Sequence, residues 1–135
     1  MKYAWNEQLG QKECPYIRRW YIDFGPFSIR LHHWLSSDDQ RNFHDHPWWY
    51  TSLVLSGSYV DISPKGAKLR KVGRVDFFPA THQHTVKVSP GGCWTLLVTG
   101  RESRQWGFWV KGKFKKRNRY FYDFGHHPCE STPKE

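Results

Sequence analysis

The sequence predicts an all-β protein, a sandwich or a barrel, and three observations support this. Short runs rich in β-branched and aromatic residues recur along the chain, separated by Gly, Pro, Ser and Asp. No long segment repeats apolar residues at the spacing of an amphipathic helix. Histidines occur in pairs, 44/46 and 82/84, and this spacing places both side chains on one face of a β-strand.

The individual strands are expected between turn signals. Gly25-Pro26, Ser56-Gly57-Ser58, Ser63-Pro64-Lys65-Gly66 and Ser89-Pro90-Gly91-Gly92 are typical of turns. In chain order, strands are expected over residues 16–24, 27–34, 49–55, 59–62, 68–71, 75–78, 84–88, 94–100, 105–110 and 119–122. A polar loop over 36–40 precedes the first histidine pair, and residues 125–135 are expected to form a loop-like tail.

The composition indicates one folded domain, residues 1–135. A chain of 135 residues suits a single core, and its 8 Trp, 7 Tyr and 9 Phe exclude a disordered protein. No apolar run approaches the roughly 20 residues that span a bilayer, and the first residues lack the apolar segment of a signal peptide. Three scattered cysteines, Cys14, Cys93 and Cys129, argue against a disulfide framework. We therefore expect a cytoplasmic protein without membrane association.

Basic residues give the chain a formal charge of +9, and many of them fall into two groups, at 65–74 and 111–119. Aromatic residues accompany the second group: Phe114 lies inside it, and Tyr120, Phe121 and Tyr122 follow. This pattern is compatible with binding of single-stranded nucleic acid, in which bases stack on aromatic rings. Because runs of charge usually face solvent, a basic turn between two late strands is the interpretation we favour.

Two histidine motifs occupy the middle of the chain. The first is His44-Asp45-His46-Pro47, and the second is Gly73-x5-Pro79-x-Thr81-x2-His84. A pair at i, i+2 and a third histidine from a neighbouring strand would complete a site of three imidazole nitrogens. In a chain with 8 histidines one such pair arises readily by chance, so the argument depends on the combination of spacings.

These spacings resemble the two motifs of the cupin superfamily, which consists of small jelly-roll barrels. The first motif, G-x5-H-x-H-x3,4-E-x6-G, is matched at His44, His46 and Gly57. The second motif, G-x5-P-x-G-x2-H-x3-N, is matched at Gly73, Pro79 and His84. The resemblance implies a double-stranded β-helix, the cupin jelly-roll barrel, with a metal ion near one mouth. It also makes a homodimer plausible.

Four positions depart from these motifs. Tyr50 stands where the first motif has its glutamate, and Asp38 stands where it begins with glycine. In the second motif, Thr81 replaces the glycine and Val88 replaces the asparagine. The resemblance therefore implies a site without the usual carboxylate ligand. It is similar in this respect to the thiol dioxygenases and diketone-cleaving enzymes of the superfamily, which use three histidines.

The expected metal ligands are His44, His46 and His84. Imidazole suits Fe, Zn, Cu and Ni, so one divalent transition metal is expected, Fe(II) first, with Zn or Ni as alternatives. Three neutral imidazoles leave coordination positions open and leave the 2+ charge of the ion uncompensated, which favours an anionic substrate. His82 shares the strand parity of His84, so it is a candidate for a fourth ligand or for a nearby base.

Five further side chains are candidate catalytic or substrate-binding residues near the metal. Tyr50 points inward by period-two counting and, with His82, is a candidate acid or base, although a half-buried structural tyrosine explains it as well. Arg41 is a candidate clamp for a carboxylate or phosphate, although an exposed loop arginine is the default. Trp48 and Trp94 are candidates for lining a substrate pocket, although tryptophans usually pack in cores.

The function expected from these observations is that of a metal-dependent enzyme acting on a small, anionic molecule, with a three-histidine Fe(II) dioxygenase first. Two alternatives stay open because the same barrel carries many activities. One is a noncatalytic binding module for nucleic acid or a nucleotide, which predicts salt-dependent polynucleotide binding without metal. The other is a Zn- or Ni-dependent isomerase or lyase, which predicts activity without dioxygen.

Overall fold

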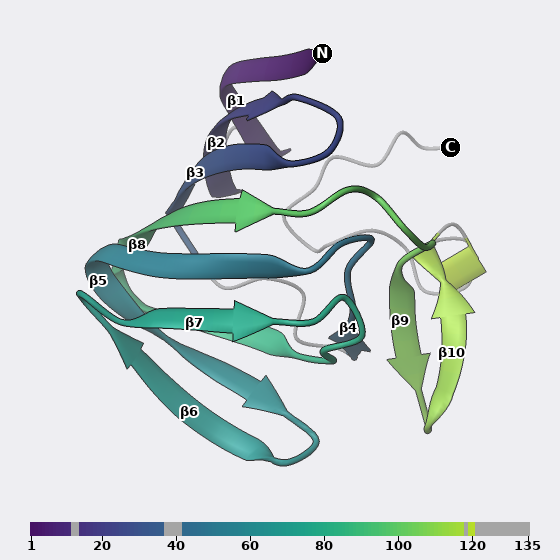
Figure 1. Cartoon of the computed structure of the whole chain (residues 1–135). Helices are drawn as coiled ribbons and strands as arrows, with labels where there is room; N and C mark the ends of the chain where they lie inside the picture. Colours follow the sequence, from purple (N-terminus) through teal and green to yellow (C-terminus); the bar gives the residue numbers. More distant parts are fainter. Residues whose placement is uncertain (12–13, 37–41, 118, 121–135) are drawn as a thin grey trace.

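The computed structural model describes residues 1–11, 14–36, 42–117 and 119–120, and 67% of it is strand. The expected tail at 125–135 and most of the expected polar loop lie outside these residues. In chain order the strands are β1 Lys2–Gln11, β2 Cys14–Asp23, β3 Ser28–Trp34, β4 Phe43–His44, β5 Tyr50–Ser63, β6 Gly66–Lys71, β7 Val75–Phe78, β8 Thr85–Thr99, β9 Gly107–Val110 and β10 Lys113–Lys116 (Figure 1).

The strands form two antiparallel sheets. The larger has the order β1-β2-β3-β8-β5-β6 with β7 also beside β5, and the smaller has the order β10-β9-β4. A bridge between His44 and His84 connects the small sheet to the start of β8. The first part of β5 pairs with β7 and the end of β8, whereas its last part pairs with β6 and the beginning of β8. The long strands thus pass from one layer to the other, and the predicted all-β jelly roll is confirmed.

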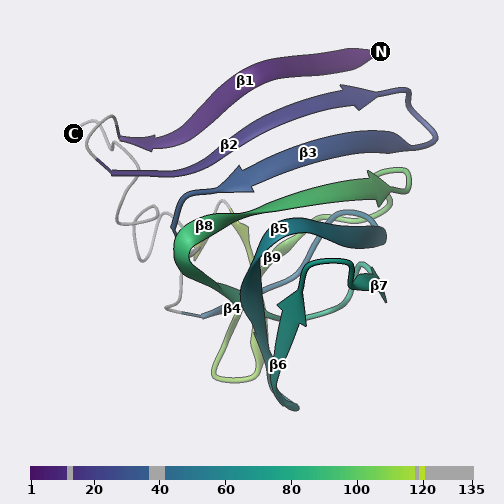
Figure 2. The same ribbon diagram turned by 90° about the vertical axis from the view of Figure 1, so that its left-hand side faces the viewer.

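Glycines make the bends at which β5 and β8 change layer, and β8 is seen curving in Figure 2. Gly57 and Gly92 both have positive φ, 76° and 90°. A Cβ on Gly57 would lie 2.3 Å from the carbonyl oxygen of Gly92, so only glycine fits where the two backbones meet. The prediction of turns at 56–58 and 89–92 was therefore wrong. Both segments are bends within continuous strands, and each pair of expected strands around them is one strand.

The other observed strands and turns agree with those expected from the sequence to different degrees. The turns at 25–26 and 63–66 are confirmed between β2 and β3 and between β5 and β6. Strand β1 was not expected, because its sequence lacks clear alternation; Asn6 takes a positive φ of 55° where the register against β2 shifts. The strand expected at 119–122 is wrong for its described part, since Arg119 and Tyr120 are helical. The basic stretch instead supplies β10.

The interior contains two groups of buried apolar side chains. One comprises Val54, Tyr59, Val86 and Cys93, and the other comprises Tyr50, Phe78 and Leu97. Burial raises the pKa of the Cys93 thiol to about 11, which makes it an unreactive packing residue.

No helix in the described part of the chain is long and apolar enough to cross a bilayer.

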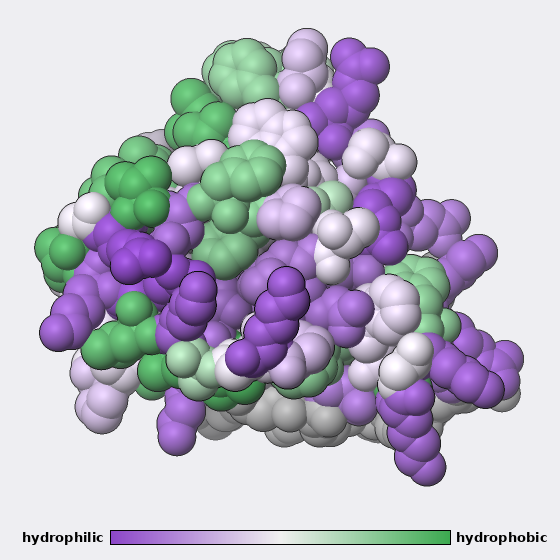
Figure 3. Space-filling view, turned by 60° about the horizontal axis from the view of Figure 1, so that its bottom comes forward, coloured by the Kyte–Doolittle hydropathy of each residue, from purple (hydrophilic) through white to green (hydrophobic). Residues whose placement is uncertain are grey.

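The two faces of the large sheet differ in chemistry. Along β8 the buried side chains include Thr95 and Thr99, whereas Val98 on the other face is 38% exposed. Ile29 on β3 and Phe77 on β7 are also exposed apolar residues. Figure 3 shows one side of the molecule on which apolar side chains gather beside long hydrophilic ones. The interior face of this sheet is thus unusually polar for a protein core.

Candidate metal centre

Backbone pairing brings the three predicted ligands together. His44 ends β4 and His84 directly precedes β8, and each backbone N–H donates to the other residue's carbonyl at 3.0 Å. His46 follows two residues later, held by its N–H, which donates to the carbonyl of Ala80 at 3.0 Å. The ring centroids are 5.2 Å apart for His44 and His46, 4.8 Å for His44 and His84, and 4.9 Å for His46 and His84. One ring nitrogen from each lies within 4.8 Å of the other two.

Asp61, on β5, fixes the orientation of His84. Nδ1 of His84 donates to Oδ2 of Asp61 at 3.2 Å, and both side chains are almost fully buried. His82 donates from Nε2 to Oδ1 of the same carboxylate at 3.1 Å. Burial alone would raise the pKa of Asp61, but the hydrogen bonds from His82 and His84 lower it below its usual range. Asp61 is therefore a carboxylate that accepts from both rings.

This hydrogen bond assigns the tautomer of His84. An ionised carboxylate only accepts, so Nδ1 of His84 carries a proton. Burial lowers the pKa of His84, which leaves the ring neutral and Nε2 with a free lone pair. That lone pair faces Nε2 of His46, 3.3 Å away. A carboxylate that holds the far nitrogen of a histidine is the usual support of a metal-ligating imidazole.

The donor set fits a divalent transition metal. Burial, followed by the fields of the neighbouring histidines, lowers the pKa of His44 and His46 well below the ordinary value, so both rings are neutral as metal binding requires. Nδ1 of His46 is buried and has no hydrogen-bond partner among the described residues. Three neutral imidazoles that converge by their nitrogens are a donor set suited to Fe, Zn, Ni or Cu.

Asp45, between the two histidines of the first motif, anchors the segment to the small sheet. Its side chain is fully buried and points away from the histidines, as the alternation of an extended chain requires. Oδ1 accepts from the backbone N–H of Gly107 at 2.8 Å, and Oδ2 accepts from Nε1 of Trp109 and lies 3.0 Å from Nη1 of Arg104. Arg104 also donates to the carbonyl of His46 at 3.1 Å. The position of both histidines thus depends on this carboxylate.

Aromatic rings surround the histidines on the interior side. The ring of Tyr50 lies 4.8 Å from His46 and stacks on Phe78 at 4.9 Å. Trp48 stacks on His46 at 5.8 Å. Trp106 and Phe108 lie with their centroids 6.3 and 6.1 Å from His44. These rings exclude water from the space beside the cluster, which strengthens electrostatic interactions there.

Most of the other candidate residues lie near the cluster, but one does not. Tyr50 and Trp48 both contact His46, as described above. His82 binds Asp61 on the far side of His84, where Asp61, His82 and His84 form a second group that could hold a metal. Arg41 lies outside the described residues.

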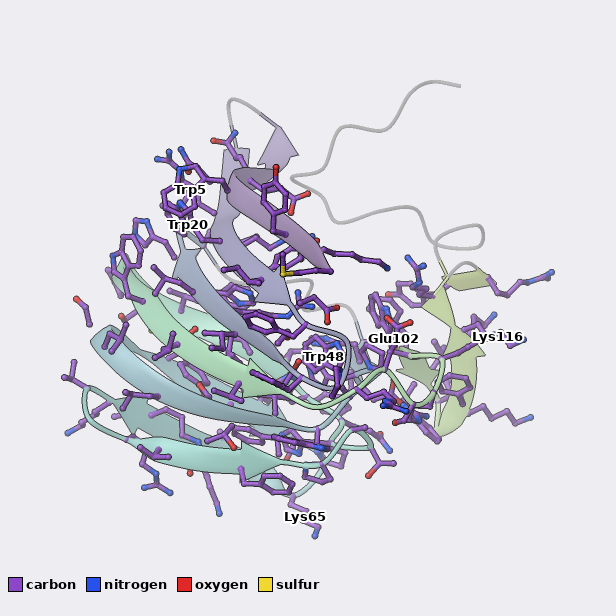
Figure 4. All side chains as sticks on the ribbon, turned by 45° about the horizontal axis from the view of Figure 1, so that its top comes forward. Trp5, Trp20, Trp48, Lys65, Glu102 and Lys116 are labelled. Atoms are coloured by element: carbon purple, nitrogen blue, oxygen red, sulfur yellow. The ribbon has the colours of Figure 1, made fainter. Side chains whose placement is uncertain are left out.

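Trp94 is not brought to the site. It lies on the outer face of β8, where it stacks on His33 at 4.1 Å and on Trp20 at 5.6 Å. Figure 4 shows Trp20 well away from Trp48, which lies in the interior. The structure therefore does not bring Trp94 to the histidine cluster, and its expected place in a substrate pocket stays a prediction.

Sequence reasoning missed two carboxylates. Asp61 lies in a strand far from either motif, and only the pairing of β5 with the start of β8 places it against His84. Asp45 offered a local signal, because a residue between two histidines at i, i+2 must point to the opposite face. An acidic residue on a face that packs against another strand indicates a buried hydrogen-bonding role.

The fold and the cluster define a jelly-roll barrel with a candidate metal site at one end. No family model matches the chain, and no curated protein matches it. Solved structures do match: the polyketide cyclase RemF from Streptomyces resistomycificus has a TM-score of 0.61 at 20% identity, covering 90% of this chain and 86% of that one. The chain therefore has the cupin fold, which agrees with the resemblance of its histidine motifs.

Two further structures have the same fold. The Fe(II) form of HppE matches with a TM-score of 0.55 at 12% identity over 69% of this chain, and a structure of the DMSP lyases RdDddP and RnDddQII matches with 0.52 at 17% over 62%. This chain spans 55% and 47% of their lengths, about half in each case. At these identities the likeness concerns the fold.

Proposed function

We propose that this protein is a metal-dependent enzyme that acts on a small, anionic molecule, and that the metal is Fe(II) in a dioxygenase. One observation carries the proposal: Asp61 orients His84 so that its free lone pair meets Nε2 of His46 at 3.3 Å, beside His44. The three rings each bring one ring nitrogen within 4.8 Å of the other two, which is the arrangement that a shared metal ion requires. The Fe(II) state of HppE, on the same fold, supports iron as the first choice.

Each residue of the cluster has its own role in the proposed enzyme. His44, His46 and His84 hold the metal, and Asp61 keeps His84 in the ligating tautomer. When bound, Fe(II) supplies open positions at which a substrate and dioxygen can meet. Tyr50 and Trp48 contact the substrate beside His46, and His82, held by Asp61, is assigned to proton handling. The ligands carry no negative charge, so an anionic group on the substrate balances the ion.

Elemental analysis tests the metal site. Untagged protein, purified without chelator or nickel resin, is compared with the His44→Ala/His84→Ala double variant and with His33→Ala as a matched control. His33 lies on the outer face against Trp94, so its removal should leave the metal in place. We expect iron near one equivalent in the parent and in His33→Ala, and none in the double variant. A parent that stays metal-free after incubation with Fe(II), Zn(II) and Ni(II) would overturn the proposal.

Zinc- or nickel-dependent lyase or isomerase chemistry is the second candidate. The observation in its favour is that solved structures with this fold include DMSP lyases and a polyketide cyclase. The same three histidines serve it, because imidazole accepts either ion. Turnover under anaerobic conditions, with zinc or nickel in the purified protein, would favour this candidate over the dioxygenase.

The nucleic-acid alternative is weakened by the ion pairs of the first basic group. Arg70 is buried and pairs with Asp76 at 2.8 Å, and Arg74 pairs with the same carboxylate at 3.0 Å. Lys65 and Lys116 project outward in Figure 4 from separate hairpins. Polynucleotide binding by metal-free protein that weakens steeply with salt would restore this alternative.

A further inference from the structure

A second polar group lies inside the barrel, on β3 and its neighbours. Arg30 is half-buried, and its guanidinium lies over the ring of Tyr21 at 4.4 Å and over the ring of Trp48 at 5.1 Å. Its Nε donates to Oγ of Ser28 at 2.9 Å, and Ser28 shares a hydrogen bond with Thr99. The arginine is thus held in a defined orientation by two aromatic rings and one hydroxyl group.

In the described part of the chain, no acidic side chain forms an ion pair with this guanidinium. Among the described residues, no carboxylate oxygen lies within 4 Å of Arg30, although the fields of Asp23 and Glu102 reach it. Neighbouring Arg19 differs, because it forms an ion pair with Glu7 at 2.6 Å. Burial, followed by the field of Arg19, lowers the pKa of Arg30. A half-buried cation without a counter-ion is costly unless a ligand supplies the negative charge.

Two further polar atoms close to Arg30 are also unsatisfied. Nε2 of His32 and Oγ1 of Thr95 are buried and have no hydrogen-bond partner in the described part of the chain. His32 is two residues along β3 from Arg30, so both side chains share the interior face, and Thr95 is the register partner of His32 on β8. Buried polar atoms are normally hydrogen-bonded, and such a cluster therefore indicates a bound molecule or water.

Trp48 connects this group to the histidine cluster. Its ring contacts the guanidinium of Arg30 and also stacks on His46. In Figure 4, Trp48 lies in the interior between the large sheet and the small one. A molecule beside the indole would therefore have the histidine cluster near one end and, near the other, a cation that no described carboxylate pairs with.

The structure assigns Arg30, with His32 and Thr95, as a carboxylate-binding subsite for the substrate of the histidine centre. A guanidinium presents paired N–H groups that match the two oxygens of a carboxylate. The aromatic walls of Tyr21 and Trp48 suit a flat, unsaturated or aromatic acid. The inference rests on the proposed function for the metal end of the substrate, but the carboxylate end can be tested without any metal.

The test uses benzoate and its neutral isostere benzamide on chelator-treated protein, with binding followed by calorimetry and by tryptophan fluorescence. We expect benzoate to bind at least about tenfold more tightly than benzamide, because the charged hydrogen bonds to Arg30 are lost with the amide. Arg30→Met should remove this preference, and Arg30→Lys should retain part of it. Arg74→Met is the matched control, since Arg74 is exposed and pairs with Asp76 elsewhere.

Three results would overturn the inference: no benzoate binding by the parent, unchanged binding by a folded Arg30→Met variant, or an equal loss in Arg74→Met. Circular dichroism checks that each variant is folded. If Arg30→Met does not fold, the benzoate preference of Arg30→Lys decides the question in its place. Failure of the proposed function has a different signature. Protein that binds benzoate through Arg30 but never takes up metal would keep the subsite and exclude the metal-dependent enzyme.

Discussion

The histidine cluster and the Arg30 group occupy the same barrel interior but differ in how their polar atoms are satisfied. Around the histidines, Asp61 accepts from two rings and Asp45 accepts from a backbone amide and an indole. Around Arg30, atoms of His32 and Thr95 have no described partner. Carboxylates of the chain hold the first region in place, although Nδ1 of His46 there is also without a described partner. In the second region, no described residue supplies a counter-ion for Arg30.

This difference separates a permanent site from an exchangeable one. Ligands of a resident metal must stay in place when the substrate leaves, so carboxylates of the chain hold them. A substrate subsite instead has to release its ligand. An arginine that no described carboxylate pairs with keeps its guanidinium available for that ligand. Substitutions in the first region should therefore cost stability and metal affinity, and those in the second should mainly change anion binding and acid sensitivity.

The largest effect is expected from Asp45→Ala. The change leaves the N–H of Gly107, the indole of Trp109 and the cation of Arg104 without their buried acceptor. We expect the free energy of unfolding to fall by about 3–5 kcal/mol, the range for breaking a buried charged pair, measured by urea denaturation of metal-free protein. Asp23→Ala is the control, because Asp23 accepts one backbone hydrogen bond at an exposed turn. Equal losses in the two variants would show that Asp45 does not anchor the motif.

Asp61→Asn should mainly affect the metal. The amide keeps one acceptor oxygen but loses the charge, so it holds the protonated Nδ1 of His84 less firmly. We expect metal affinity to fall about 10–100-fold, the usual effect of changing a group that supports a ligand. Competition with a chromogenic chelator measures this, and Asp76→Asn on the Arg70 ion pair serves as control. Unaltered affinity in Asp61→Asn would mean that the carboxylate does not orient His84.

The sequence predicted the fold class from local spacing, and the grouping of the three histidines from the resemblance of the two motifs. Alternation of residues reports the face of a strand, and His44 and His46 are two residues apart whatever the rest of the chain does. The bends were not predictable in this way, because the need for glycine at 57 arises from the carbonyl of Gly92, far along the chain. Misreading that bend as a turn also hid that Trp94 lies on the outer face.

The roles of Asp61 and Arg30 were not predicted because their contacts come from strands that are distant in the sequence. Asp61 and Arg30 lie in strands that the sequence did predict, but nothing local shows that one faces His84 and the other faces Trp48. Only the register of β5 on β8, and of β3 on β8, decides these contacts. The predicted clamp, Arg41, was chosen because it is close to His44 in the sequence and lies outside the described residues, whereas Arg30 lies on β3.

His32 should make the protein less stable in acid. Burial, followed by the fields of Arg19 and Arg30, lowers the pKa of His32 to about 3, while in the unfolded chain it returns to about 6.5. Between these values the unfolded state binds the extra proton, so stability falls as the pH falls, by no more than about 1.4 kcal/mol per pH unit. His32→Gln should therefore flatten the decline of stability below pH 6.5 in urea titrations of metal-free protein. The buried histidines of the cluster titrate in both proteins and cancel from the difference, so parallel curves would refute this assignment.

The smallest effect is expected from Trp48→Leu, which tests whether the two regions share one ligand. Removing the indole takes away one of the two rings over Arg30 and the surface beside His46. An interaction of this kind is worth about 0.5–1 kcal/mol, so benzoate should bind about two- to fivefold more weakly. Trp94→Leu removes the same type of side chain from the outer face of β8 and should leave benzoate binding unchanged. If the two variants behave alike, the benzoate signal comes from the protein as a whole, and the indole does not join the arginine to the histidines.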